Sequence, residues 1–223
     1  MSETAIPPED MTLDELRVAL APLLPAEAAF DGWSPVALAR AAEALGIPAD
    51  RAALVFPKGA VDMIDAWFAG VDGAMCQALP PAALAAMKMR ERIRALVWAR
   101  IAAMASDREA LRRALAILAH PQNAPRAARL AWRAADAIWR LAGDSATDFN
   151  HYSKRAILVG VYGATLLAWL NDDTEGFGDT AGFLDRRIDD VMRFEKAKAR
   201  LMPAPGGRFS LVRLLGRLRY PAH

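Results

Sequence analysis

The chain has 223 residues, enough for one large domain or for a small domain joined to a larger one. Hydrophobic residues make up 54% of it, yet no uncharged stretch, the apolar one at residues 156–170 included, reaches the roughly 18–20 residues that a membrane-spanning helix needs. The one cysteine, Cys76, excludes an internal disulfide, and we expect it to pack inside an apolar helix rather than to act as a nucleophile. The N-terminus lacks the basic and apolar regions of a signal peptide, so we expect a cytoplasmic bacterial protein, with a processed organelle protein as the alternative.

The net charge of +2 hides a strong asymmetry along the chain. Residues 1–80 hold 4 Lys/Arg against 12 Asp/Glu, a net charge of −8, whereas residues 81–223 hold 24 against 14, a net charge of +10. DNA affinity comes largely from Lys and Arg side chains that neutralise phosphates. The acidic N-terminal part is therefore expected not to bind nucleic acid.

Turn signals divide the first 80 residues into four short predicted helices. Asp10 or Thr12 can cap the first helix, and Pro25 is expected to close it. Ser34 followed by Pro35 is a good start for the second helix, because proline is favoured at the first helical position. The predicted ranges are 13–24, 35–45, 49–55 and 58–79.

The rest of the chain predicts longer helices, at 82–105, 108–119, 124–142, 148–170 and 179–201, and a last helix at 209–220. Neither a strand pattern of period two nor an internal repeat occurs, so we expect an all-α protein. The expected organisation is a head of short helices (1–80), a body of longer helices (81–201), a Pro/Gly linker (202–207) and an amphipathic helix (208–223).

The predicted helix 148–170 begins in a polar, aromatic segment and continues without a charge from residue 156 onward. A helix without a polar face has to be surrounded, either by other helices or by an apolar ligand. Gly160 and Gly163 lie inside it, where each glycine costs about 1 kcal/mol. Close contact with a neighbouring helix and room for a lipid chain beside the backbone are equally good explanations.

The last predicted helix is basic and amphipathic. Its leucines form one narrow stripe at 100° per residue, and arginines lie opposite. Such a helix behind a Pro/Gly linker is typical of an anchor on a membrane surface, although it could also fold back on the body or contact a second copy. The candidate membrane-binding residues are Leu211, Arg213, Leu214, Leu215, Arg217 and Leu218.

Nothing in the sequence points to catalysis. The only histidines are His120, His151 and His223, and no Glu-x-x-His pair is present, which excludes a di-iron carboxylate bundle of that ligand pattern. A phosphate loop, zinc-ligand spacing and a nucleophile elbow are also missing, so we expect no catalytic residue, metal or cofactor. The pair Asp172/Asp173 is expected to be a solvated helix end.

Several passages resemble the coenzyme Q biosynthesis protein family of TetR-like lipid-binding accessory factors. They recur in order and at similar spacing, densely over about 85–215 and more loosely in the head. They are residues 89–98 (MRERIRALVW), 121–125 (PQNAP), 136–140 (DAIWR), 143–150 (GDSATDFN), Arg155, 172–175 (DDTE) and 183–187 (FLDRR).

The resemblance implies a TetR-like fold, with a helix-turn-helix-like head (1–80), a lipid-binding and dimerisation body (81–201) and a membrane-binding helix (208–223). It also implies a non-catalytic accessory protein of ubiquinone biosynthesis. Such a protein lies on the membrane as a homodimer and presents a prenylated quinone precursor to the di-iron ubiquinone hydroxylase. The implied lipid-binding residues are Trp98, Ile101, Trp132, Leu158, Val161, Tyr162, Leu166 and Phe183. The implied partner-binding residues are Trp139, Asp148, Asn150, His151, Tyr152 and Arg155. His151 stands where relatives commonly carry a tryptophan, and an aromatic anchor is the kind of residue that dominates an interface.

Two other functions stay open at this point. A TetR-like protein could be a ligand-responsive transcription regulator, against which the acidic head argues. The chain could also be a structural scaffold of a biosynthetic complex, in which case changes in the pocket would leave quinone levels unchanged.

Overall fold

The computed structural model describes residues 7–144 and 149–201, without the side chains of 149–150 and 194–201. Every regular element in this part of the chain is a helix, which confirms the all-α prediction. The α-helices are α1 (Leu13–Leu20), α2 (Leu24–Asp31), α3 (Pro35–Glu43), α4 (Ala49–Val55), α5 (Ala60–Ala78), α6 (Pro81–Ala85), α7 (Met89–Ala102), α8 (Arg108–Leu118), α9 (Ala124–Leu141), α10 (Phe149–Leu170) and α11 (Gly178–Leu201). Two 3₁₀ turns, η1 (Pro121–Asn123) and η2 (Glu175–Phe177), precede α9 and α11.

The head begins as its capping residues predict, but it contains one helix more than expected. Thr12 and Glu15 form a capping box at the start of α1, and the Ser34 hydroxyl accepts a hydrogen bond from the Ala37 N–H at 3.3 Å. Pro25 does not end a helix; it lies in the first turn of α2. Proline is tolerated there because the N–H groups of a first turn have no partner within the helix. The prediction of one helix over 13–24 was therefore wrong.

The predicted helix 82–105 is also two helices, α6 and α7. Lys88 has an extended backbone (φ −70°, ψ 156°) and caps α7, and its N–H donates to Glu91 Oε2 at 2.8 Å. That interaction satisfies a backbone donor at a new helix start, so the chain can turn there at little cost. The other predicted body helices match the observed ones to within a residue or two.

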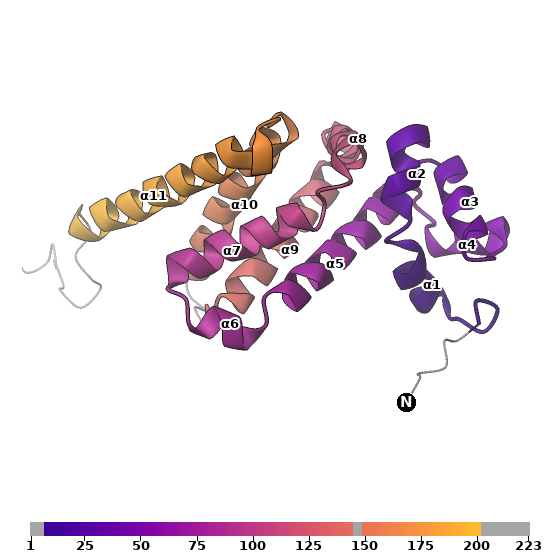
Figure 1. The fold of residues 1–223 in the computed structure, drawn as a ribbon, viewed down its shortest axis with the longest axis horizontal. Helices are drawn as coiled ribbons and strands as arrows, with labels where there is room; N and C mark the ends of the chain where they lie inside the picture. The colour runs from indigo at the N-terminus through magenta and orange to yellow at the C-terminus, as the bar shows by residue number, and fades with distance from the viewer. Residues whose placement is uncertain (1–6, 145–148, 202–223) are drawn as a thin grey trace, which may run out of the picture.

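A single long helix, α5, leads from the head into the body (Figure 1). In the body α5 packs against α7, α8 and α9, while α10 packs against α9 and α11. The head is attached to the body through Trp33, whose indole stacks near Trp67 of α5 and donates to the Ala110 carbonyl oxygen of α8 at 3.0 Å. None of the helices in the described ranges is both long and apolar enough to span a bilayer.

The apolar helix α10 is covered on most of its circumference but not on all of it. Leu158, Leu166 and Trp169 are buried, whereas Leu167 is 58% exposed and Gly160 is also exposed. The expectation that the helix is surrounded on every side is thus wrong for one face of the single chain. Close contact with a neighbouring helix does not explain the glycines either, because a Cβ at Gly160 or Gly163 would meet nothing within 4 Å among the described residues.

Candidate functional site

A largely apolar cavity lies between α7, α8, α9 and α10, with Phe68 of α5 at its side. Its volume is about 310 Å³, at the lower end of the roughly 300–1,000 Å³ typical of ligand pockets. Gly163 of α10 is part of the wall, so the missing side chain there adds to the space. The wall consists of Phe68, Arg100, Leu115, Leu118, Ala119, Ala127, Leu130, Ala131, Ala134, Val159, Tyr162, Gly163 and Leu166.

Two polar side chains face this cavity, Arg100 of α7 and Tyr162 of α10. The Arg100 guanidinium is 2% exposed; its Nε donates to Tyr162 Oη at 3.1 Å, and its carbon lies 5.3 Å from the centre of the Tyr162 ring. Its Nη1 forms an ion pair with Asp72 of α5. A buried charge is tolerated when it is paired and hydrogen-bonded, as this one is.

A second, smaller hollow of about 90 Å³ lies on another side of α10, between α7 and α11. Leu158 and Val161 line it, and Trp139 lies at its edge. It is closed off toward α11 by Ile188, Val191 and Met192. The two hollows place neighbouring residues of α10 in different environments, because successive helical residues point about 100° apart.

The eight predicted lipid-binding residues are therefore spread over several places. Tyr162 and Leu166 line the larger cavity, whereas Leu158 and Val161 line the smaller one. Of the other four, Ile101 is buried in the core, Trp98 is half-buried, Trp132 lines a polar hollow between head and body, and Phe183 lies under the Arg187 guanidinium. Sequence reasoning missed Arg100, although it is the only charged residue between Arg94 and Asp107.

The start of α10 presents aromatic side chains to the outside. Tyr152 is 61% exposed, its ring centre lies 6.1 Å from that of Trp132 on α9, and the His151 ring contacts it edge-on at 5.1 Å. Of the predicted partner-binding residues, Asp148 lies outside the described residues, and the side chain of Asn150 does as well. Among the described ones, Tyr152 offers the largest exposed aromatic surface at this helix start.

Arg155, in contrast, is an internal residue that holds the helix start in place. Its guanidinium is buried and donates from Nε to Asp136 at 2.6 Å and from Nη1 to Asp144 at 3.3 Å and to the His151 carbonyl oxygen at 3.1 Å. The Trp139 indole donates to the Lys154 carbonyl oxygen at 3.1 Å, and the Lys154 ammonium lies above its ring. These side chains fix α10 against α9 and the turn before it, so they position the exposed residues rather than present a surface.

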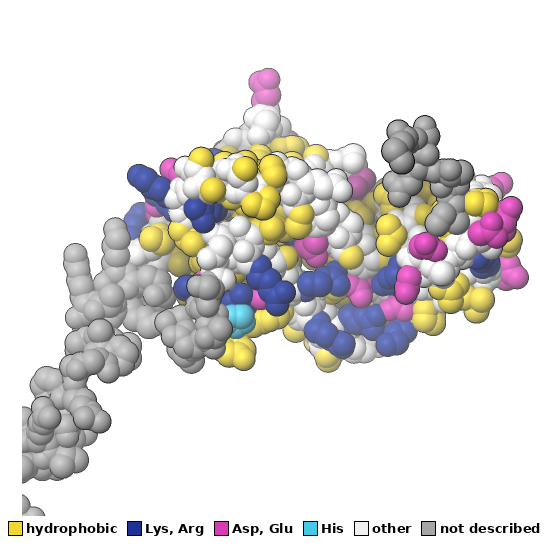
Figure 2. All heavy atoms as spheres, turned by 90° about the horizontal axis from the view of Figure 1, so that it is seen from below, with side chains coloured by type: hydrophobic (Ala, Val, Ile, Leu, Met, Phe, Trp, Pro, Cys, Tyr) yellow, Lys and Arg dark blue, Asp and Glu magenta, His cyan; other side chains and the backbone are white. Residues whose placement is uncertain are grey.

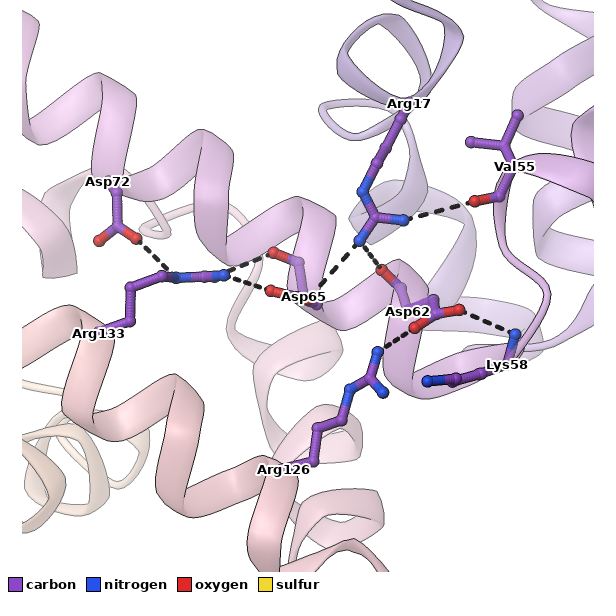
Figure 3. Close-up of polar contacts among 8 residues, drawn as sticks. All are labelled: Arg17, Val55, Lys58, Asp62, Asp65, Asp72, Arg126 and Arg133. Atoms are coloured by element: carbon purple, nitrogen blue, oxygen red, sulfur yellow. Dashed lines mark hydrogen bonds and ion pairs between the residues drawn. The ribbon is translucent and has the colours of Figure 1, made fainter. Parts of the chain in front are cut away.

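Ion pairs join the α5 helix of the head to α9 of the body (Figure 3). Arg126 pairs with Asp62, while Arg133 pairs with both Asp65 and Asp72. Arg17 of α1 also reaches α5, donating to the Asp62 carbonyl oxygen at 3.0 Å. Figure 2 shows Lys and Arg side chains gathered in a band on this face of the body, and Asp and Glu gathered toward the head.

Asp172 corrects one further prediction, because it is buried rather than solvated. Its carboxylate accepts hydrogen bonds from the backbone and the hydroxyl of both Thr174 and Thr180, at 2.6–2.9 Å, which ties the end of α10 to the start of α11. The Thr174 hydroxyl, followed by that of Thr180, lowers the pKa of Asp172 far below the usual range. Asp173 is solvated as expected.

Cys76 is exposed, so the expectation that it packs inside an apolar helix was wrong.

The candidate membrane-binding residues, Leu211, Arg213, Leu214, Leu215, Arg217 and Leu218, lie outside the described residues.

The head, the long connecting helix and the helical body together define a TetR-like fold. The solved structure of the TetR transcriptional regulator from Nitrosomonas europaea ATCC 19718 is similar, with a TM-score of 0.64 over 79% of this chain and 98% of that chain. The two sequences are 24% identical, so the likeness establishes the fold alone.

Sequence comparison gives the family. Residues 124–195, from α9 into α11, match the COQ9 family model. The chain is 48% identical over 80 residues to the mitochondrial ubiquinone biosynthesis protein COQ9 of Rattus norvegicus, and 32% identical over 168 residues to that of Homo sapiens. These alignments cover 36% and 72% of this chain but 26% and 52% of the relatives, so the chain spans about half of their length or less. The chain belongs to the COQ9 family.

Proposed function

We propose that this chain is a non-catalytic lipid-binding accessory protein of ubiquinone biosynthesis. It takes a prenylated quinone precursor out of the membrane and presents it to the di-iron ubiquinone hydroxylase. The observation that carries the proposal is the apolar cavity of about 310 Å³ in the body of a COQ9-family chain. Because this volume is small for a pocket, the cavity holds only part of a polyprenyl ligand.

The hydroxylase binds, in this proposal, at the start of α10. Tyr152 and the half-buried His151 supply exposed aromatic surface there, and Arg155 holds their backbone in place. Exposed aromatic side chains backed by a rigid support are typical of the residues that dominate interfaces.

The protein acts at the inner membrane of a bacterium as a peripheral homodimer. The basic helix that the sequence predicts around Arg213 and Arg217 supplies attachment, since each cation near an anionic leaflet contributes about 1 kcal/mol. The uncovered face of α10 around Leu167 supplies the contact between two copies. Replacing Leu167 with glutamate should convert the dimer to a monomer in light scattering, and a dimer that persists would place the contact elsewhere.

A TetR-like regulator is the second candidate, favoured by the fold alone. The head is poorly suited to DNA, because three of its four cations, Arg17, Arg40 and Arg51, bond groups within the head. Arg51, the only cation of α4, donates to the carbonyl oxygens of Glu9 and Met11 at 2.9 and 2.5 Å, and Arg40 pairs with Asp31 at 2.8 Å. Sequence-specific DNA binding at physiological salt would favour the regulator.

The test is lipid extraction of protein purified from native membranes, followed by mass spectrometry. We expect an isoprenoid lipid with the wild-type chain and severalfold less with Gly163→Met, which fills the cavity from its wall. Gly160→Met is the matched control, because Gly160 lies on the same helix but outside both hollows. A wild-type protein without lipid that also ignores liposomes would refute the proposal. Loss of lipid binding with unchanged quinone levels in the Gly163→Met strain would favour a scaffold.

A further inference from the structure

The larger cavity contains hydrogen-bonding groups that a hydrocarbon tail could not use. Arg100 is nearly inaccessible to solvent, and the Nε and Nη1 atoms of its guanidinium bond Tyr162 and Asp72. Guanidinium carries five N–H donors, and within the described residues the others meet no acceptor. Buried donors that face hydrocarbon are unfavourable, so these groups favour a ligand with an oxygen atom.

The direction of the hydrogen bond at Tyr162 identifies the group that faces such an oxygen. Because the phenol oxygen accepts from Arg100 Nε, the phenol's own hydrogen points in another direction. No described residue accepts a hydrogen bond from this buried hydroxyl, and Tyr162 is part of the cavity wall. A buried tyrosine hydroxyl usually finds a partner, and accepting one hydrogen bond strengthens it as a donor.

The Arg100 guanidinium already has a carboxylate partner inside the protein. Asp72 pairs with both Arg100 and Arg133, and Asp65 pairs with Arg133 and with Arg17. A ligand carboxylate would have to be buried in a cavity whose wall is apolar apart from Arg100 and Tyr162, which costs more than burying an uncharged oxygen. The cavity therefore suits an uncharged oxygen, such as a quinone carbonyl, an ether or a phenol.

We propose that the cavity receives the ring end of the lipid, with the Tyr162 hydroxyl donating a hydrogen bond to an uncharged ring oxygen and Arg100 positioning that hydroxyl. This inference rests on the proposed lipid binding and adds which end of the ligand enters. It also agrees with the small volume of the cavity, which accommodates a substituted ring and the first carbons of a tail rather than a full polyprenyl chain.

The test compares two short ligands that share one tail. The probes are 2,3-dimethoxy-5-methyl-6-geranyl-1,4-benzoquinone and geranylbenzene, which lacks every oxygen, and binding is measured by titration calorimetry with the full chain. Tyr162→Phe should weaken quinone binding about fivefold, as expected for one hydrogen bond, and leave geranylbenzene binding unchanged. Tyr152→Phe is the matched control, because it removes the same hydroxyl from an exposed tyrosine outside the cavity, and it should change neither.

A second variant keeps the test decisive if Tyr162→Phe folds poorly. Arg100→Met preserves the length of the side chain, and Asp72 retains its pairing with Arg133 at 3.3 Å. It should also weaken the quinone severalfold without weakening geranylbenzene. If the wild-type chain bound both probes equally and neither variant changed this, the proposal that the cavity receives the ring end would be overturned. The proposed lipid binding would still stand. If neither probe binds the wild-type chain, the proposed entry of the ring end and the proposed lipid binding both fail.

Discussion

Replacing Arg155 with methionine should destabilise the protein by about 3 kcal/mol. Removing one partner of a buried ion pair costs about 3–5 kcal/mol because a buried charge is left unpaired. Here both carboxylates keep a second cation: Asp136 stays paired with Arg140 at 2.8 Å and Asp144 with Lys154 at 2.7 Å. The loss of stability is therefore expected at the lower end of that range. It includes the contribution of the hydrogen bond from Arg155 to the His151 carbonyl oxygen.

The assay is thermal and urea unfolding at pH 7, followed by circular dichroism. For a chain of this size, about 3 kcal/mol corresponds to a fall in Tm of roughly 6–12 °C. Arg140→Met is the matched control: Arg140 also pairs with Asp136, but its side chain is 75% exposed, so its loss should cost at most about 0.5 kcal/mol. If Arg155→Met lost less than about 1 kcal/mol, or no more than Arg140→Met, the buried network would not be what holds the start of α10.

Three further predictions concern the loop after α10, the partner surface and the C-terminus. Asp172→Asn removes a carboxylate whose pKa is lowered in the folded state, so the stability it contributes is present above the unfolded pKa of about 3.9 and is lost as the pH falls below it. The urea midpoints of wild type and Asp172→Asn should differ by a constant amount from pH 7 to pH 5 and converge toward pH 3; a gap that stays constant to pH 3 would contradict the assignment. Tyr152→Ala should weaken hydroxylase binding at least tenfold in a pull-down or interferometry assay without changing Tm, because the ring is mostly exposed; unchanged binding would move the partner surface elsewhere. Deletion of residues 203–223 should abolish co-sedimentation with anionic vesicles and leave thermal unfolding unaltered, whereas full binding after deletion would assign the membrane contact to the body.

Helix positions were largely predictable because local signals determine them, and the two errors show where such signals are ambiguous. Pro25 is compatible both with the end of one helix and with the first turn of the next, and the choice depends on how α2 packs against α3 and α8. The break before α7 rests on Lys88, a residue type with no capping preference. Glu91 accepts a hydrogen bond from the Lys88 N–H only when the chain turns at Lys88, so Glu91 alone does not predict a helix start there.

The candidate site was less predictable than the fold, for a reason specific to α10. A helix that is apolar on all sides carries no pattern from which to infer which face meets a cavity, a neighbouring helix or a second copy. Tyr162 and Val161 are adjacent in sequence but line different hollows. Arg155 lay in a recognisable motif, yet only its packing against Asp136 and Asp144 distinguishes a supporting residue from a surface residue.

The ion pairs along α5 bear on the choice between accessory protein and regulator. In a ligand-responsive regulator, occupation of the body has to move the head, so the connecting helix must be able to shift between two arrangements. Here the aspartates of α5 are held from the body side, Asp62 by Arg126, and Asp65 and Asp72 by Arg133 (Figure 3). Arg17 also binds the same helix from the head, through the Asp62 carbonyl oxygen. Any shift of α5 along α9 would separate several of these charges together, and such coupled pairs resist displacement more than isolated surface pairs do. A head held in this way favours a fixed support for the body over a moving DNA reader.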